Sequence, residues 1–267
     1  MTETLFFDSL THTSHRGDWL GQEKFDASLT RLLKEIETVK PYRACLVNIA
    51  GHSDNDELAA IASQHRDLFV PIAGFNPATH TSDAGIESEL AELAERGFAG
   101  IKLHPRLNDY DPLDARCLKA ISHAARCKLV VLIDTLFRQK GRYVAHPADI
   151  IDRIAFSCPD TRIVLLHGGA GALLDIYEIV RMRVNLLLDT SFTLMRYAGS
   201  SLDDDIRFAF RSLDQRTTVG SDFPEYSLPE VRHHLARFLD ELPQAKSDNI
   251  FFKNLDRFFA EWSERYL

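Results

Sequence analysis

The sequence has few cysteines, and their spacing excludes the common cysteine-based sites. Four are present in 267 residues, and none forms a close C-x-x-C pair. Zinc knuckles and C-x-x-C redox motifs are therefore not expected. Four scattered cysteines in a chain of this length favour a reducing compartment. These cysteines are Cys45, Cys117, Cys127 and Cys158.

The chain also lacks the segments that direct a protein to or across a membrane. The stretch from Met1 to Leu5 has no basic region followed by a long apolar run, so no signal peptide is predicted. No apolar stretch is long enough to span a bilayer. No linker rich in Ser, Gly or Pro divides the sequence, and no segment is of low complexity. We expect a cytoplasmic protein with a single domain over residues 1–267.

An excess of positive charge is absent as well. The 31 Lys and Arg residues are outnumbered by 39 Asp and Glu residues, which gives a formal net charge of −8 at pH 7. This balance argues against nucleic acid and anionic membranes as partners. Nothing in the sequence fixes the oligomeric state, and a homodimer is only the commonest assembly of soluble proteins.

What the sequence does contain is a regular alternation of two patterns. Eight short apolar runs, rich in Val, Ile and Leu, mostly lack polar alternation, as strands buried on both faces do. The runs are Leu5–Phe7, Ala44–Ala50, Leu68–Phe75, Ala99–His104, Lys128–Asp134, Arg162–His167, Val184–Asp189 and Thr217–Ser221. The predicted helices between and after them are Ala27–Val39, Asp54–His65, Asp83–Arg96, Asp114–Arg126, Pro147–Phe156, Ala172–Val180, Ser201–Leu213 and Pro229–Leu239.

Eight strands, each followed by a helix, predict a closed parallel barrel of the (β/α)8 or TIM type. A doubly wound open sheet is the alternative. The longest predicted loops are Pro105–Leu113 and Leu136–His146. An extra amphipathic helix, Ser247–Leu267, ends the chain, and we expect its phenylalanines to pack on the outside of the barrel. These are Phe251, Phe252, Phe258 and Phe259.

Titratable side chains gather where the predicted strands end, which is the catalytic face of such a barrel. Because side chains alternate along a strand, Asp8, Leu10 and His12 are expected to share a face. Imidazoles and carboxylates that converge there can hold a divalent metal, which activates water for hydrolysis. Taken singly, each is better explained as a hydrogen-bonded structural residue. The strand-end residues are Asp8, His12, Lys102, His104, Arg106, Asp134, His167, Asp189 and Asp222.

Several of these residues lie in stretches that resemble a known family. The stretches are Phe7–His12, Gly100–Pro105 (GIKLHP), Val164–Gly169 (VLLHGG), Leu188–Ser191 (LDTS) and Val219–Pro224 (VGSDFP). In this order and spacing they resemble the amidohydrolase superfamily, in particular its amidohydrolase-related branch of small barrel hydrolases, decarboxylases and lactonases. The stretch Ile250–Phe259 resembles the helix that closes these barrels. The resemblance spans nearly the whole chain.

The resemblance implies a metal site, but two positions depart from the family pattern. The family has Asp-x-His-x-His at its first strand, whereas Leu10 here replaces the first histidine. Asp134 stands where the family usually has a histidine, and an aspartate can ligate zinc or manganese. The implied ligands of one divalent metal, zinc or manganese, are His12, Asp134 and Asp222. Metal-free function is the alternative, because related lactonases work without metal and Leu10 cannot ligate.

The resemblance also implies catalytic roles. Asp222 would be the general base that takes a proton from the attacking water. His167 would polarise the substrate carbonyl or orient the water, and His104 and Lys102 would stabilise an oxyanion. The amides of Gly168 and Gly169 could bind an anion, although a tight turn is the simpler explanation.

Basic residues in the loops of the catalytic face indicate a small anionic substrate. We take Arg106 and Arg142 as the substrate-binding candidates, and His146 as a substitute metal ligand. The favoured hypothesis is a hydrolase of a C–O or C–N bond in a small carboxylated substrate. The alternatives are a metal-independent lactonase or isomerase, a decarboxylase, and an inactive ligand-binding barrel.

Overall fold

A computed structural model of the chain describes residues 4–14, 16–21, 24–139, 142–143 and 146–266. For residues 138, 139, 142 and 143 it describes the backbone alone. Within these residues, no helix is long and apolar enough to cross a membrane.

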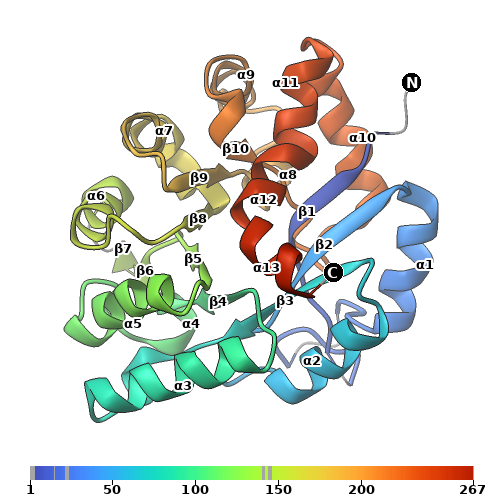
Figure 1. Cartoon of the computed structure of the whole chain (residues 1–267). Helices are drawn as coiled ribbons and strands as arrows, with labels where there is room; N and C mark the ends of the chain where they lie inside the picture. The colour runs from blue at the N-terminus through green and yellow to red at the C-terminus, as the bar shows by residue number, and fades with distance from the viewer. Residues whose placement is uncertain (1–3, 15, 22–23, 140–141, 144–145, 267) are drawn as a thin grey trace.

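The eight predicted strands form one parallel sheet, in the order of the chain (Figure 1). Its strands are β1 (Phe6–Thr11), β2 (Tyr42–Val47), β3 (Phe69–Gly74), β4 (Gly100–Leu103), β5 (Val130–Asp134), β8 (Ile163–Leu166), β9 (Leu186–Asp189) and β10 (Thr217–Thr218). Every neighbouring pair in this order is parallel.

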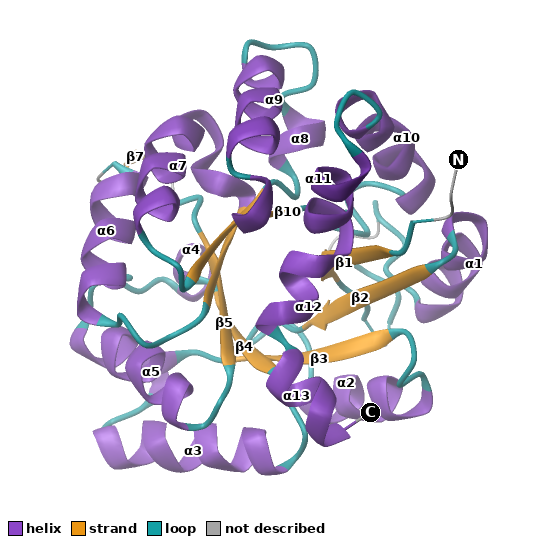
Figure 2. Ribbon diagram, turned by 45° about the horizontal axis from the view of Figure 1, so that its top comes forward, coloured by secondary structure: helices purple, strands orange, loops and turns teal. Residues whose placement is uncertain are grey.

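The first and last strands also meet, so the sheet curls into a nearly closed barrel (Figure 2). Thr11 and Phe223 form a parallel bridge. The Ser9 amide donates to the Val219 carbonyl at 3.1 Å, and the Asp222 amide donates to the Leu10 carbonyl at 2.9 Å. The predicted TIM barrel is thus confirmed. The alternative of a doubly wound open sheet is wrong, because an open sheet leaves its edge strands unpaired.

Helices surround the barrel, and several of them begin where the sequence supplies a start signal. Asp54 and Asp114 accept hydrogen bonds from amides of the first turn, as N-cap residues do. Pro147 occupies the first turn of its helix. The ring helices are α1 (Leu29–Val39), α2 (Asn55–Gln64), α3 (Asp83–Glu95), α5 (Ala115–Arg126), α6 (Pro147–Ser157), α7 (Leu173–Met182), α9 (Leu202–Ser212) and α10 (Leu228–Leu239).

Shorter elements fill segments that the sequence pattern does not resolve. The segment Leu136–His146, predicted as a loop, contains the antiparallel hairpin of β6 (Arg138–Gln139) and β7 (Arg142–Tyr143). Strands of two residues are too short for any periodicity to appear. The other short elements are η1 (Pro77–Thr79), α4 (Pro105–Asn108), η2 (His167–Ala172), α8 (Thr193–Arg196), η3 (Asp214–Arg216), α11 (Gln244–Asp248), η4 (Asn249–Lys253), α12 (Asn254–Phe258) and α13 (Ala260–Tyr266).

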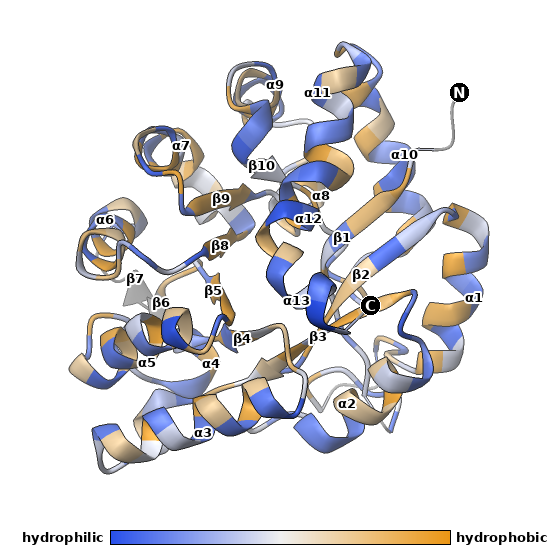
Figure 3. Ribbon diagram, viewed as in Figure 1, coloured by the Kyte–Doolittle hydropathy of each residue, from blue (hydrophilic) through white to orange (hydrophobic). Residues whose placement is uncertain are grey.

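Two large apolar clusters among the described residues hold the barrel together. One lies between the strands and the ring helices, and the other lies inside the barrel. Hydrophobic residues dominate the strands, while the ring helices carry both kinds of residue (Figure 3). This pattern follows from burial, because a strand inside a ring of helices has both faces covered while a ring helix has one.

The C-terminal helices α12 and α13 close the N-terminal end of the barrel. Phe258 and Phe259 belong to the interior cluster. The indole of Trp262 donates to the Gly97 carbonyl, just before β4, at 2.8 Å. The expectation that these phenylalanines pack outside the barrel is therefore wrong for Phe258 and Phe259. The periodicity of a helix shows which face is apolar but not which surface that face covers.

Candidate active site

The opposite, C-terminal end of the barrel gathers the predicted catalytic side chains. These side chains come from five different strands, and each is buried, because the barrel wall surrounds it. These residues are His12 after β1, Lys102 in β4, His104 after β4, Asp134 at the end of β5, His167 after β8, and Asp222 after β10.

Asp8 does not join this group. The pairing of β1 with β2 shifts register between Asp8 and Thr11, so strict alternation fails there. Asp8 accepts hydrogen bonds from the hydroxyl of Tyr42 at 2.8 Å and from the Ser221 amide at 2.8 Å. Leu10 instead packs in the interior apolar cluster. The expected common face of Asp8, Leu10 and His12 is therefore wrong, because a bulge changes which side chains point inward.

One half of the site is built around Asp134, whose Oδ2 atom has three neighbours. His104 Nε2 lies at 3.2 Å, His167 Nε2 at 3.5 Å and Arg106 Nη2 at 3.5 Å. We call these four residues the Asp134 cluster. Burial alone would raise the pKa of Asp134, but its three partners together hold that pKa well below the ordinary value. Asp134 is therefore an ionised carboxylate that positions three side chains.

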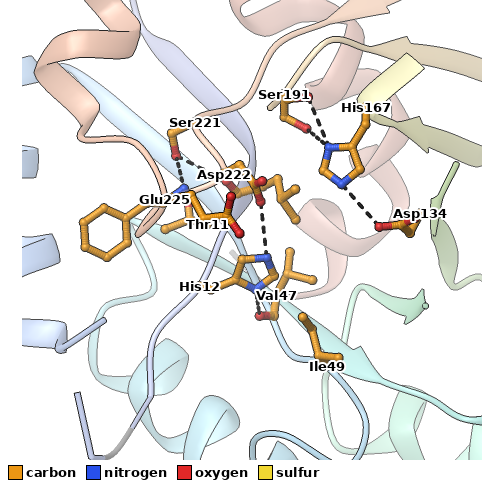
Figure 4. A network of polar contacts seen from close by, with 12 residues as sticks. Thr11, His12, Val47, Ile49, Asp134, His167, Ser191, Ser221, Asp222 and Glu225 are labelled. Carbon is orange, nitrogen blue, oxygen red and sulfur yellow. Dashed lines mark hydrogen bonds and ion pairs between the residues drawn. The ribbon is translucent and has the colours of Figure 1, made fainter. Parts of the chain in front are cut away.

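The two histidines of this cluster differ in charge. Burial lowers the pKa of His104 to about 3, so its ring is neutral. Burial also acts to lower the pKa of His167, but the hydrogen bond to Asp134 and the charge of Asp222 outweigh it and raise that pKa. His167 Nδ1 lies 3.1 Å from the Ser191 carbonyl, so each ring nitrogen faces an acceptor (Figure 4). This arrangement favours the imidazolium form of His167.

The other half of the site is the pair of His12 and Asp222, whose Nε2 and Oδ1 atoms are 3.7 Å apart (Figure 4). His12 Nδ1 lies 2.7 Å from the Val47 carbonyl, which places the proton on Nδ1. Burial, followed by the charge of Lys102, lowers the pKa of His12 well below its ordinary value. The neutral ring therefore presents the lone pair of Nε2 to Asp222.

Asp222 is held in a conformation that non-glycine residues rarely adopt. Its φ of 55° lies in the left-handed region, and its amide donates to the Leu10 carbonyl. Burial raises the pKa of this carboxyl to about 7; His167 opposes that rise and Glu225 adds to it. A carboxyl with this pKa can both accept and return a proton near neutral pH.

Lys102 is influenced by the charges of both halves. Burial lowers the pKa of its ammonium group to about 8, while the carboxylates of Asp134 and Asp222 act against that lowering. Close to neutral pH it thus remains mainly a cation beneath the site. A cation in a buried, low-dielectric place is suited to stabilising developing negative charge.

A cavity of about 210 Å³ opens over these groups. Arg106 lines it, as the sequence predicts for a substrate-binding residue. Phe192 and Glu225 also line it, and the sequence analysis missed both. Their one local signal is position, since Phe192 follows the LDTS motif and Glu225 follows VGSDFP. The lining residues are Arg106, Leu136, His167, Phe192, Asp222 and Glu225.

The remaining predicted positions have different outcomes. The side chain of Arg142 lies outside the described part of the structure. His146 caps α6 and pairs with Asp175 at the surface, at 3.4 Å, which leaves no role as a substitute ligand. The Gly169 amide donates to the hydroxyl of Thr135 at 2.7 Å, and Gly168 and Gly169 have positive φ. The tight-turn interpretation of these glycines therefore holds.

The donor set does not fit a bound metal. Across the described ranges of the chain, no group of three or more His, Cys, Asp or Glu side chains is placed to hold an ion. His12 and Asp222 face each other, but Asp134 lies with His104, Arg106 and His167. The implied ligand set of His12, Asp134 and Asp222 is thus divided between the two halves.

Comparisons with known proteins agree with the fold. A family model described as Amidohydrolase matches residues 20–247. A search of curated proteins finds no match. An uncharacterised TIM-barrel protein from Bordetella bronchiseptica is 18% identical, with a TM-score of 0.79, over 97% of this chain and 99% of that one.

Two further solved structures carry named activities. A probable 2-pyrone-4,6-dicarboxylic acid hydrolase from Acinetobacter baumannii, with citric acid bound, is 13% identical with a TM-score of 0.72, over 96% of this chain and 99% of that one. A 5-carboxyvanillate decarboxylase from Novosphingobium aromaticivorans, with manganese and 4-hydroxy-3-methoxy-5-nitrobenzoic acid, is 12% identical with a TM-score of 0.72, over 97% and 99%. At these identities the likeness concerns the fold.

Proposed function

The chain belongs to the amidohydrolase family of enzymes, and we propose that it hydrolyses a C–O or C–N bond at the carbonyl of a small carboxylated substrate, with Asp222 as general base. One observation carries this proposal. Asp222, with a pKa raised to about 7, lines the same cavity as Arg106 and His167. A base, an anion-binding guanidinium and a cationic imidazole thus surround one space, which suits acyl transfer to water.

The reaction begins with proton transfer from water to the Asp222 carboxylate as the water oxygen attacks the carbonyl carbon. The tetrahedral oxyanion that forms then collapses, and the C–O or C–N bond breaks. Asp222 returns its proton to the leaving oxygen or nitrogen, which gives a carboxylic acid and an alcohol or amine. His12 presents the Nε2 lone pair to Asp222 and shares its proton in the protonated state.

The remaining groups bind and orient the substrate. Arg106 is placed to hold the substrate carboxylate, because a guanidinium can donate two parallel hydrogen bonds to it. His167 and Lys102 supply positive charge for the oxyanion. Asp134 keeps Arg106 and His167 in place by contacting both.

The groups that would stabilise the oxyanion, His167 and Lys102, suit a lactone or another ester better than an amide. An alkoxide leaves a tetrahedral intermediate more readily than an amine does, so an ester needs less activation of its carbonyl. Leu10 stands where the family has a ligand histidine, and it packs against apolar neighbours. The relative named as a hydrolase of 2-pyrone-4,6-dicarboxylic acid gives this option a precedent on the same fold. Decarboxylation is the alternative proposal, since another relative is named as a decarboxylase.

A panel of carboxylated lactones, esters and amides, assayed for product with and without a chelator, tests the proposal. We expect acid release from a lactone or ester that survives chelation and falls as the pH drops below about 7. Release of carbon dioxide instead would establish the decarboxylase.

The variant Asp222→Asn tests the assigned base. It should lower kcat by a factor of about 10² to 10⁴, because its amide cannot accept the proton, while the circular dichroism spectrum stays native. Asp175→Asn, at an exposed carboxylate on α7, is the matched control and should leave turnover unchanged. Full activity of Asp222→Asn would contradict the assignment.

A further inference from the structure

Glu225 places a second carboxylate in the cavity beside the proposed base. It follows Asp222 by three residues, and its amide donates to the Asp222 carbonyl at 3.0 Å. Both side chains line the cavity. Their charges also interact, since Glu225 contributes to the raised pKa of Asp222. Two neighbouring carboxylates repel each other, so this arrangement requires a compensating partner.

Part of the compensation comes from Trp19. Its indole Nε1 donates to Glu225 Oε1 at 3.2 Å. The same indole lies against the His12 ring, with centroids 4.5 Å apart. Trp19 therefore fixes the Glu225 side chain relative to His12. Among the residues that the structure describes, no Lys or Arg side chain lies within 4 Å of the Glu225 carboxylate.

The cavity thus has a cationic side and an anionic side. Arg106 and His167 belong to the Asp134 cluster. Glu225 instead lies near Asp222, whose pKa its charge raises, and it is linked to His12 through Trp19. A substrate carboxylate held by Arg106 would extend its other end toward Glu225. A second carboxylate at that end would meet two negative groups, while a hydroxyl or amino group could donate a hydrogen bond to Glu225.

We propose that Glu225 is a specificity-determining residue, which selects substrates that carry, besides the carboxylate bound by Arg106, a hydroxyl or amino group that donates to the Glu225 carboxylate. This inference rests on the proposed function, because it takes the same cavity as the substrate site. Phe192 and Leu136 add apolar side chains to the lining of the same cavity. The preferred substrate is therefore a small hydroxy- or amino-substituted monocarboxylate, and a dicarboxylate is disfavoured.

Calorimetric binding of four small acids to the full chain tests the inference without any need for turnover. The probes are benzoate, 3-hydroxybenzoate, 3-(aminomethyl)benzoate and isophthalate. They share one carboxylate and differ in the group at the ring position meta to it: hydrogen, hydroxyl, a protonated aminomethyl group or a second carboxylate. We expect the hydroxyl or the ammonium probe to bind at least about tenfold more tightly than benzoate, and isophthalate to bind most weakly. The comparison of the two donor probes shows which donor Glu225 selects.

Three variants complete the test. Glu225→Gln should reduce the preference for the donor probes to about threefold or less and should strengthen isophthalate binding, because it removes the charge but keeps the shape. Glu264→Gln, at an exposed position of α13, is the control and should bind as the unmodified protein does. Arg106→Ala should weaken all four probes alike.

An unchanged preference in Glu225→Gln would overturn the inference, as would isophthalate binding tightest to the unmodified protein or no probe binding at all. These outcomes are separate from a failure of the proposed function. That failure would appear as full turnover in Asp222→Asn, whereas probe binding does not depend on any chemical step.

Discussion

Asp134 and Asp222 are both buried at the ends of barrel strands, yet their surroundings shift their pKa values in opposite directions. Three partners hold the pKa of Asp134 low, whereas burial raises the pKa of Asp222 to about 7. Two carboxyl groups separated in this way can take different roles, one as a fixed charge and one as a proton carrier. The different roles of these two carboxyl groups thus depend on their local contacts and not on residue type.

The raised pKa of Asp222 has a consequence for stability. A carboxyl whose pKa rises from 3.8 to about 7 on folding stabilises the native state below about pH 4, and this contribution is lost as the pH rises through about 7. Asp222→Asn has no charge to bury. At about pH 8.5 its free energy of unfolding should therefore exceed that of the unmodified protein by up to about 4 kcal/mol. Urea denaturation at about pH 5.5 and about pH 8.5 measures this, and the difference should be smaller at the lower pH. Equal stability of the two proteins at both pH values would contradict the burial argument.

Removing the Asp134 carboxylate should change the charge of its neighbour. His167 owes its raised pKa to the hydrogen bond with Asp134 and to nearby charge, against the opposing effect of burial. In Asp134→Asn the pKa of His167 should therefore fall, which nuclear magnetic resonance of the ring nitrogens can follow across a pH titration. Asp175→Asn, which faces His146 at the surface, is the control and should leave His167 unaltered. An unchanged His167 titration in Asp134→Asn would show that Asp134 does not set its charge.

At the scale of elements, the end of the barrel depends on how helix and strand termini are satisfied. The loop that carries Asp222 and Glu225 leads directly into α10, whose N-terminus forms a capping box. The Ser227 hydroxyl accepts from the Glu230 amide, and the Glu230 carboxylate accepts from the Ser227 amide. This reciprocal pair fixes the start of the helix and therefore the end of the loop.

Ser227→Ala should consequently destabilise the fold by about 1 kcal/mol, because the first turn of α10 loses its cap. The free energy of unfolding from urea denaturation checks this. Ser88→Ala, at an exposed position inside α3, is the matched control and should change stability by less than about 0.5 kcal/mol. If both variants behave alike, the cap contributes nothing.

At the scale of the whole molecule, the two ends of the barrel are used differently. The C-terminal end holds the charged site, and the N-terminal end is sealed by α12 and α13. The sealed N-terminal end keeps water out of the apolar interior of the barrel, which lies next to Lys102 and the histidines. The charge chemistry of the upper end depends on this exclusion, because burial is the largest influence on the pKa values of Lys102, His104 and Asp222.

Phe259 is the residue that tests this closure. It is about 1% exposed and packs with Phe7 inside the barrel, at 6.3 Å between ring centroids. Phe259→Ala should lower the free energy of unfolding by about 3 to 5 kcal/mol, since it leaves a cavity in a dense cluster. Phe156→Ala removes a ring that is 76% exposed and should have little effect. A small loss of unfolding free energy in Phe259→Ala would mean that the packing of the C-terminal helices against the barrel contributes little to stability.

The pattern of apolar and polar residues is enough to predict the barrel and the end of it where the polar residues meet. Eight apolar runs without polar alternation specify strands covered on both faces, and parallel strands bring His104, Asp134, His167 and Asp222 to one end. These features follow from local periodicity, which is visible within a stretch of a few residues.

Which of these side chains face each other depends on long-range packing that the local pattern does not contain. The bulge in β1 turned Asp8 toward Tyr42, and the register of neighbouring strands joined Asp134 to its cationic partners instead of to His12. Trp19 and Glu225 lie 206 residues apart in sequence, and they meet because β1 and the segment that follows β10 are neighbours. Contacts of this kind arise from register and closure between distant segments, and their electrostatic effects depend on a few ångströms that no local pattern encodes.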